Sequence, residues 1–331
     1  MNSITVIRTF SRPAGPAVRL GLCLGVAGAF LLPPVSRAEN PGAAAAASSP
    51  IAQETFPSPE AAADSLILAA ERFDAPALMK IFGPTGVDLV VTEDPVHDGN
   101  QSAAFAAEAR KQTSVVRDPE NPKIAILSVG MDDWPLPIPI VEEGGRWRFD
   151  TEAGREEILL RRIGRNELDA IELCRGYVEA QYEYAAEKRG GALVNQYAQR
   201  VISTPGKQDG LAWQDPDGTW QGPVGETIAR VIAEGYDTQP TPYHGYYFKI
   251  LKGQGPAAPL GEMDFLVQGA MIGGFALTAA PAEYEVTGVK SFIVSHTGIV
   301  YEKDLGPKTL DEFRAMERFN PDSTWSPVTE P

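Results

Sequence analysis

The stretch that decides the fold is EEILLRRIGRNELDAIELCRGYVEAQYEYAAEK, residues 156–188. Its apolar residues recur at helical spacing and form one side of a single long helix: Ile158, Ile163, Leu168, Ile171, Cys174, Val178 and Tyr182. Arginines and glutamates occupy most of the other side. Such a segment predicts an amphipathic helix laid on a sheet rather than a membrane helix. Gly164 and Gly176 weaken it by about 1 kcal/mol each relative to alanine.

The residues after this helix predict a connecting region followed by an antiparallel sheet. Val194–Val201 extends the helical pattern, 203–206 and 215–218 are turn sequences, and Val224–Ala233 predicts a short helix. Strand patterns and a closing helix then follow at 245–251, 275–280, 290–295, 298–303 and 309–319. We therefore expect residues 156–331 to form one α+β domain.

The residues before the helix, 56–155, predict a second α+β domain. Ser58 and Asp74, each followed closely by a proline, are typical of helix starts. A third helix is expected at 102–112, followed by strands at 123–130, 135–142 and 146–150. Because Pro135, Pro137 and Pro139 cannot donate ladder hydrogen bonds, the segment that holds them is expected to be an edge strand. Helices followed by an antiparallel meander again indicate the α+β class.

The first 38 residues have the three parts of a secretory signal. Residues 1–19 contain three arginines and no acidic residue, residues 20–35 are almost wholly apolar, and Ser36-Arg37-Ala38 ends in a small-x-small cleavage site. Two prolines shorten the apolar run to about 13 residues, against about 20 for a membrane span. We expect Sec-type export with cleavage near Ala38, and therefore a periplasmic or secreted protein.

Residues 39–55 are rich in Ala, Ser, Pro and Gly and predict a flexible linker. Cys23 raises the alternative of a lipid anchor, although Leu22 stands where a lipid-attachment motif has a small residue. Cys23 leaves with the signal, so Cys174 is alone in the mature chain and no internal disulfide can form. Its place on the apolar side of the helix favours a buried thiol over a nucleophile.

The chain is acidic, with 29 Lys and Arg against 44 Asp and Glu and a formal net charge of −15. Removal of the signal with its four arginines would leave −19. A surface this negative disfavours nucleic acid and anionic lipid as partners. No segment after the signal is apolar for long enough to span a membrane. For an exported acidic protein, an envelope protein or a glycan is the expected kind of partner.

Few residues suggest chemistry. The three histidines, His97, His244 and His296, are far apart in the sequence, and no HExxH, CxxC, GxSxG or phosphate-binding loop is present. We therefore expect no cofactor and no catalytic residue. Asp215 and Asp217 before Gly218, with Glu226, resemble a calcium loop, although Asp-Pro and Asp-Gly are also ordinary turn sequences.

Two aromatic segments are candidate binding sites. Tyr243, His244, Tyr246 and Tyr247 form the densest aromatic cluster, which reads either as core packing of a strand or as a glycan-contact surface with His244 as its polar group. Asp133 and Trp134 offer a weaker version of the same choice, with a carboxylate beside an aromatic ring.

Several short sequence motifs together resemble those of the DUF2950 family of exported bacterial proteins, over about residues 56–328. They are Asp133-Trp134-Pro135, Trp147–Asp150, Ala153–Glu157, Arg161–Glu167, Ser203–Lys207, Pro242–Phe248, Met271–Ala276 and Val300–Gly306. The resemblance implies export and no stated activity. Many members carry an Asp/Gly-rich turn before the counterpart of Tyr197-Ala198-Gln199, where this chain has Lys188-Arg189-Gly190-Gly191.

Each half also has a looser likeness. The element order, the Trp147–Asp150 strand end and the length of residues 56–155 resemble NTF2-like or cystatin-like folds, which enclose a pocket between helix and sheet. Residues 156–328 are similar to the globular part of type IV pilin-like proteins, through Tyr246–Phe248, Ala279–Ala282, Thr287–Phe292 and Thr297–Val300. The apolar helix half that builds pilin filaments is missing, so the likeness implies a pilin-like fold and not a pilin subunit.

These patterns favour an exported envelope protein that serves as a non-catalytic binding or assembly module. One alternative is a hydrolase of envelope glycan or peptide, which would need His244 and a carboxylate, or two carboxylates, to converge in a cleft. Another is a small-ligand or lipid carrier that uses a cavity in the first domain.

Overall fold

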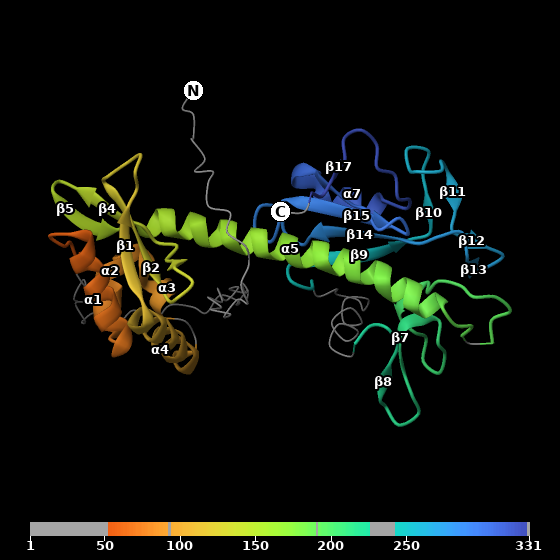
Figure 1. Cartoon of the computed structure of the whole chain (residues 1–331), viewed down its shortest axis with the longest axis horizontal. Helices are drawn as coiled ribbons and strands as arrows, with labels where there is room; N and C mark the ends of the chain where they lie inside the picture. The colour runs from red at the N-terminus through yellow and green to blue at the C-terminus, as the bar shows by residue number, and fades with distance from the viewer. Residues whose placement is uncertain (1–51, 92–93, 190, 226–241, 330–331) are drawn as a thin grey trace, which may run out of the picture. The chain divides into compact units, whose positions relative to one another are not determined.

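The computed structural model describes residues 52–91, 94–189, 191–225 and 242–329. The predicted signal peptide and most of the predicted linker lie outside these residues. The chain divides into two compact units (Figure 1). The division falls between Ile158 and Leu159 along the chain, and each unit is described by itself. Both units combine helices with mainly antiparallel strands, so the predicted α+β class is confirmed.

Short helices open the first unit, and capping side chains set where they begin. They are α1 (Pro59–Glu71), α2 (Ala75–Phe82), the 3₁₀ turn η1 (Pro84–Gly86), α3 (Val87–Val90) and α4 (Pro95–Lys111). Ser58 Oγ accepts the backbone N–H of Ala61 at 3.2 Å, which starts α1 as predicted.

Helix α4 begins seven residues earlier than predicted, at Pro95 instead of Ser102. Asp94 Oδ1 accepts the backbone N–H groups of Val96 (3.1 Å) and His97 (3.0 Å), and Pro95 occupies the first turn. The helix therefore includes His97. Its acid-then-proline start is a helix signal that the polar residues after it obscured.

The sheet of the first unit has the order β1-β2-β4-β5, with β3 paired to β2. Its strands are β1 (Thr113–Arg117), β2 (Ile124–Val129), β3 (Trp134–Pro135), β4 (Ile140–Glu143) and β5 (Arg146–Phe149). The prediction of an edge strand over 135–142 is wrong, because β4 lies between β2 and β5. Strand β4 begins only after Pro139, so the prolines restrict the start of the strand and not its place in the sheet.

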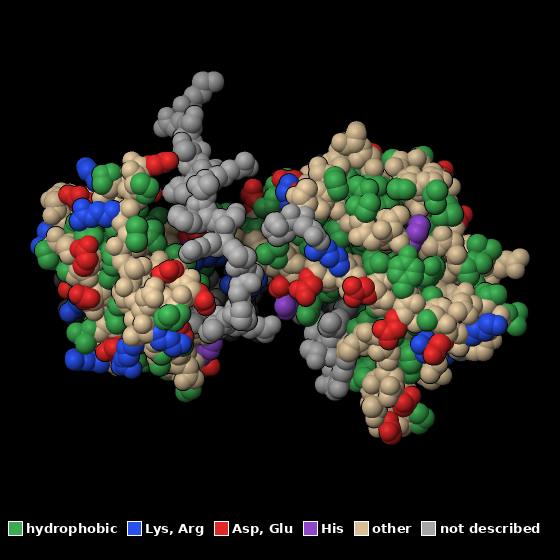
Figure 2. Space-filling view, in the orientation of Figure 1, with side chains coloured by type: hydrophobic (Ala, Val, Ile, Leu, Met, Phe, Trp, Pro, Cys, Tyr) green, Lys and Arg blue, Asp and Glu red, His purple; other side chains and the backbone are tan. Residues whose placement is uncertain are grey.

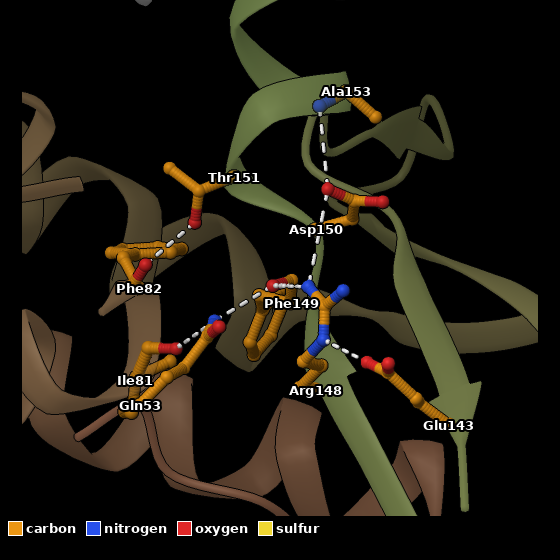
Figure 3. A network of polar contacts seen from close by, with 9 residues as sticks. All are labelled: Gln53, Ile81, Phe82, Glu143, Arg148, Phe149, Asp150, Thr151 and Ala153. Atoms are coloured by element: carbon orange, nitrogen blue, oxygen red, sulfur yellow. Dashed lines mark hydrogen bonds and ion pairs between the residues drawn. The ribbon is translucent and has the colours of Figure 1, made fainter. Parts of the chain in front are cut away.

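Polar contacts join the end of β5 to its neighbours (Figure 3). Gln53 Nε2 donates to the carbonyl oxygens of Ile81 (3.0 Å) and Phe149 (2.7 Å), so the ordered contacts of this unit begin within the segment assigned to the linker. The hydroxyl of buried Thr151 donates to the carbonyl of Phe82 at 2.7 Å. Each bond satisfies a carbonyl at an element end, where the regular ladder stops.

One long helix, α5 (Thr151–Ala185), supplies residues to both units. The remaining elements belong to the second unit, whose main sheet has the order β17-β16-β15-β14-β9. These strands are β9 (Tyr246–Leu251), β14 (Ala276–Pro281), β15 (Lys290–Ser295), β16 (Val300–Asp304) and β17 (Ser326–Pro327). All six residues of β14 are buried, so both faces of the sheet are covered at its centre.

Shorter elements complete the second unit. Strand β6 (Arg200–Ile202) pairs in parallel with β7 (Gly210–Gln214), which pairs antiparallel with β8 (Trp220–Gln221). Two small hairpins are formed by β10 (Gly253–Gln254) with β11 (Met263–Asp264), and by β12 (Leu266–Val267) with β13 (Ala270–Met271). The 3₁₀ turn η2 (Gly306–Lys308) and α7 (Thr309–Ala315) precede β17.

The buried side of α5 overlaps the predicted one and extends beyond it. Ile163, Ile171, Cys174 and Val178 are buried as predicted. Leu168 is 63% exposed and Tyr182 48% exposed. The buried positions in the second unit include Ala170, Cys174, Tyr177, Gln181 and Tyr184. Periodicity did not find the additional positions, because they include a small residue and a buried glutamine, which carry little hydrophobic signal.

The region after α5 also departs from the prediction. The helix does not extend over Val194–Val201, because α5 ends at Ala185 and β6 occupies 200–202. The closing helix ends at Ala315, and the helix predicted at Val224–Ala233 lies mostly outside the described residues. None of the helices in the described part of the chain combines the length and apolar character of a membrane span.

Two glycines of α5 should respond oppositely to alanine. A Cβ on Gly154 would lie 2.6 Å from Cγ1 of Ile138 and 3.1 Å from its Cα, whereas a Cβ on Gly176 meets nothing within 4 Å. We expect Gly154→Ala to lower the free energy of unfolding by about 1–3 kcal/mol through overpacking. Gly176→Ala should raise it by about 0.5–1 kcal/mol through helix propensity. Urea unfolding measures both, and equal effects would contradict the packing described.

Burial should keep Cys174 unreactive. The side chain is fully buried and burial raises the pKa of the thiol to about 12. The neutral thiol therefore contributes stability that is present below about pH 9 and is lost as pH rises towards 12. In protein made without residues 1–38, we expect a thiol reagent at pH 8 to label Cys174 only after unfolding in urea. Rapid labelling of the folded protein would show that the helix side is wrongly placed.

Candidate functional site

Tyr246, in β9, belongs to the core rather than to a surface. Its side chain is 1% exposed, its hydroxyl donates to the carbonyl of Lys290 at 2.8 Å, and burial raises the pKa of that hydroxyl. Gly288 leaves the space that the ring occupies, since a Cβ there would fall onto the tyrosine hydroxyl. Of the two interpretations of this cluster, core packing describes Tyr246.

His244 lies outside the strand and forms a pair with Asp169 of α5. Its Nδ1 is 2.5 Å from Asp169 Oδ2, and the ring of Tyr243 stacks on the imidazole with centroids 4.2 Å apart. The residue takes the left-handed conformation, with φ of 46°, in a turn where Tyr243 and Tyr246 exchange backbone hydrogen bonds. If Asp169 accepts from Nδ1, Nε2 of the neutral ring can accept a proton. His244 is 44% exposed, and it lines neither of the two cavities described below.

Asp133 and Trp134 lie in the first unit, whereas the Tyr243–Tyr247 segment lies in the second. Asp133 has a φ of 49° and accepts a hydrogen bond from Gln112 Nε2 at 2.8 Å. Trp134 begins β3, opposite Val129 of β2, and its ring is partly exposed. The two predicted aromatic sites therefore lie in different units of the chain.

Asp215 and Asp217 form the turn between β7 and β8. Asp217 Oδ1 accepts the backbone N–H of Thr219 at 2.9 Å, and hydrogen bonds from Thr219 lower the pKa of this carboxyl. Glu226, the third residue of the predicted calcium site, lies outside the described residues. Within the described ranges, no group of three or more His, Cys, Asp or Glu side chains is placed to hold a metal ion.

A cavity of about 860 Å³ lies in the second unit, between the end of α5 and strands β6, β7 and β8. Tyr184 comes from α5, Arg189 from the segment after it, and Trp213 and Trp220 from β7 and β8. The loop between β6 and β7 supplies Ser203, Thr204, Lys207 and Asp209. This cavity brings together side chains from four parts of the chain, which makes it the main candidate site.

Arg189 is held between aromatic rings at the wall of this cavity. Its guanidinium carbon is 4.9 Å from the ring centroid of Trp213 and 5.3 Å from that of Tyr184. Its Nε donates to the carbonyl of Tyr184 at 3.3 Å, and its side chain is 16% exposed. Cations over ring faces are attracted by the ring quadrupole, so the two rings orient the guanidinium before any ligand arrives.

The loop between β6 and β7 is fixed by its own hydrogen bonds. Both oxygens of Asp209 accept from Thr204, one from the backbone N–H at 2.7 Å and one from the hydroxyl at 2.8 Å. Burial acts to raise the pKa of Asp209, but these bonds outweigh it and the pKa is lowered. Ser203 Oγ accepts the N–H of Gly210 at 2.8 Å, so the loop presents a preformed wall.

A second cavity of about 580 Å³ lies beside β9 and the end of α7. Two of its four basic side chains hold parts of the fold together. Lys249 Nζ donates to the carbonyls of Phe313 (2.6 Å) and Arg314 (3.0 Å) at the end of α7, and Arg318 pairs with Asp264 at 2.6 Å. These groups are engaged, so this cavity is the weaker candidate.

Sequence patterns did not identify the larger cavity. Arg189 stood out only as part of an unusual turn, and Trp213 and Trp220 were not singled out. A usable signal was the two tryptophans flanking the Asp215–Gly218 turn, because a hairpin places such residues close together: Trp213 pairs with Gln221 and Gln214 with Trp220. The partners from α5 and the β6–β7 loop cannot be read from that local pattern.

These features define a two-unit α+β protein with a preformed polar and aromatic cavity in its second unit. The sequence profile of the family described as "Protein of unknown function (DUF2950)" matches residues 53–328, and the chain belongs to this family, as its motifs predicted. No curated protein and no solved structure matches the chain.

The Thr204–Asp209 bonds predict a dependence of stability on pH. Because the folded pKa of Asp209 is lowered, its contribution is full above the unfolded value near 3.8 and is lost as pH falls through the folded pKa. Thr204→Val should remove one bond and cost about 0.5–1.5 kcal/mol at pH 7. The difference from the parent should shrink below pH 3.8 in urea unfolding, and a difference independent of pH would contradict this account.

Proposed function

We propose that this protein is a non-catalytic binding module of the bacterial cell envelope, exported to the periplasm or beyond, whose ligand site is the Arg189 cavity. The observation that carries the proposal is the cavity itself. It is large enough for a ligand of several sugar or amino-acid residues, and its walls are ordered by contacts within the chain. A preformed site lowers the entropy cost of binding.

The lining groups suit binding better than catalysis. Arginine stays protonated and cannot act as a base. The carboxylate of Asp209 is fully occupied by Thr204, and its lowered pKa makes it a poor proton donor near neutral pH. The lining also offers aromatic faces and hydrogen-bond donors, which suit recognition of a polar ligand.

Export and compartment rest on the sequence. The arginine-containing start, the short apolar run and the Ala38 site support secretion. The acidic mature chain supports a soluble role with a protein or glycan partner rather than with nucleic acid. Calcium at Asp215, Asp217 and Glu226 remains a separate proposal, supported by the two acidic residues of the β7–β8 turn.

A hydrolase acting on envelope glycan or peptide is the second candidate. The His244–Asp169 pair favours it, because a carboxylate that holds Nδ1 leaves Nε2 as a general base. The carrier alternative in the first unit has less support, since side chains such as Leu127, Ile140 and Phe149 fill the space between helices and sheet.

We also propose finer fold relationships for the two units. Helices followed by an antiparallel meander support an NTF2-like or cystatin-like fold for the first. A long helix, a connecting region and an antiparallel sheet support a pilin-like fold for the second.

The proposal predicts that soluble fragments of the producing bacterium's envelope stabilise the mature protein. A ligand at about 100 times its dissociation constant adds about 2.7 kcal/mol, which a thermal melt detects. Trp220→Ala should abolish the stabilisation, and Trp134→Ala, which changes a partly exposed tryptophan in the other unit, should not.

Three outcomes would count against the proposal. No fragment stabilises the parent protein, or the stabilisation persists in Trp220→Ala, or the fragments are cleaved. Cleavage that stops in His244→Ala would establish the hydrolase candidate instead.

A further inference from the structure

The larger cavity contains hydrogen-bond donors that the chain itself does not satisfy. The indole N–H of Trp220 is buried and has no hydrogen-bond partner among the described residues. Buried donors are nearly always paired, so this N–H gains an acceptor if a molecule bound in the cavity reaches it.

Arg189 offers further donors in the same cavity. Of its five N–H groups, Nε uses the carbonyl of Tyr184, and Nη2 is 3.6 Å from Oε2 of Glu187, a side chain that is 73% exposed. A surface ion pair of this length contributes little. No other partner of this guanidinium occurs in the described part of the chain, so its outer N–H groups remain available.

Several acceptors of the cavity are already engaged. Both oxygens of Asp209 accept from Thr204, Ser203 Oγ accepts from Gly210, and the hydroxyl of Tyr184 donates to the carbonyl of Gln208 at 2.5 Å. Formal charge is balanced there, since Arg189 and Lys207 line the cavity together with Asp209 and Asp215. Net charge therefore does not select the ligand, and the free N–H groups of Arg189 are the groups that can.

We propose that this cavity binds a carboxylate group of its ligand, with Arg189 as the bidentate partner and the Trp220 N–H as a further donor; this rests on the proposed binding function. A guanidinium presents two parallel N–H groups that match the two oxygens of a carboxylate. The rings of Trp213 and Tyr184 fix its plane. In an envelope ligand the carboxylate belongs either to a peptide terminus or to an acidic sugar.

The test is calorimetric titration of the mature protein with matched acid and ester probes. N-acetylmuramoyl dipeptide represents the peptide source and a galacturonate trisaccharide the sugar source, each beside its methyl ester. We expect the acid form of one probe to bind at least tenfold more tightly than its ester, since hydrogen bonds to a charged group are about twice as strong as neutral ones. The probe that binds identifies the source.

Two variants connect the preference to the named donors. Arg189→Lys keeps the charge but not the paired N–H groups, and Trp220→Phe keeps the ring but not the N–H. Each should weaken acid binding about tenfold and leave ester binding unchanged. Arg314→Lys, at an exposed arginine outside this cavity, serves as control. Thermal melts check folding, and if Arg189→Lys misfolds, Trp220→Phe alone decides.

The outcomes separate this inference from the function on which it rests. Equal binding of acid and ester, or acid binding unaffected by both variants, overturns the carboxylate assignment. If no probe binds while envelope fragments still stabilise the parent but not Trp220→Ala, the carboxylate assignment fails and the binding function stands. If the fragments have no effect either, both fail.

Discussion

The burial of one side of α5 is the constraint on which the second unit depends. Cys174 and Tyr177 lie in the same core as Phe275 and Phe292, and Tyr177 packs edge-on against Phe275 at 5.6 Å. Apolar burial of this kind is the main favourable term in folding. The helix cannot rotate without exposing this side, so the residues at its end are fixed in direction as well.

The fixed direction of the helix places Tyr184, near its end, in the wall of the larger cavity. Gln181, fully buried, donates to the carbonyl of Ala198 at 2.9 Å and accepts its N–H at 2.8 Å, which returns the chain to the helix after Ala185. About one turn further along the helix, the ring of Tyr184 makes a cation–π contact with the guanidinium of Arg189. The cavity thus depends on a buried glutamine that satisfies both groups of one backbone residue, and a buried amide of this kind is costly to leave unpaired.

Charged side chains are mixed over the surface, whereas those that line the cavity balance in sign and are partly held by hydrogen bonds. Acidic side chains are scattered among basic ones on the visible faces of both units (Figure 2), although the chain carries a net charge of −15. At the cavity the charges balance and the carboxylate of Asp209 is engaged by Thr204. An acidic protein can therefore offer a local donor-rich site, because hydrogen bonds and cation–π contacts act at short range while the net charge is screened over about 10 Å.

Local sequence chemistry predicted much of the fold, and its failures have physical causes. The caps at Ser58 and Asp74 and the strands β9, β14, β15 and β16 were predicted, because caps and strand periodicity are local signals. The buried side of α5 was predicted in part: Cys174 is buried as expected, whereas Gln181 and Ala170 are buried by tertiary contacts that hydropathy does not report. For the candidate site, Tyr246 followed the core interpretation, and no local pattern could bring Tyr184, Arg189 and Trp213 together.

The most direct test of the central claim, that the Arg189 cavity is the ligand site, is NMR of the five tryptophan indole N–H signals during titration with soluble envelope fragments. Two of these tryptophans, Trp213 and Trp220, line the cavity, while Trp134, Trp147 and Trp325 do not. The account predicts that the Trp220 signal shifts most and that the last three stay in place. Binding that moves the signal of Trp134, Trp147 or Trp325 while that of Trp220 stays fixed would contradict it.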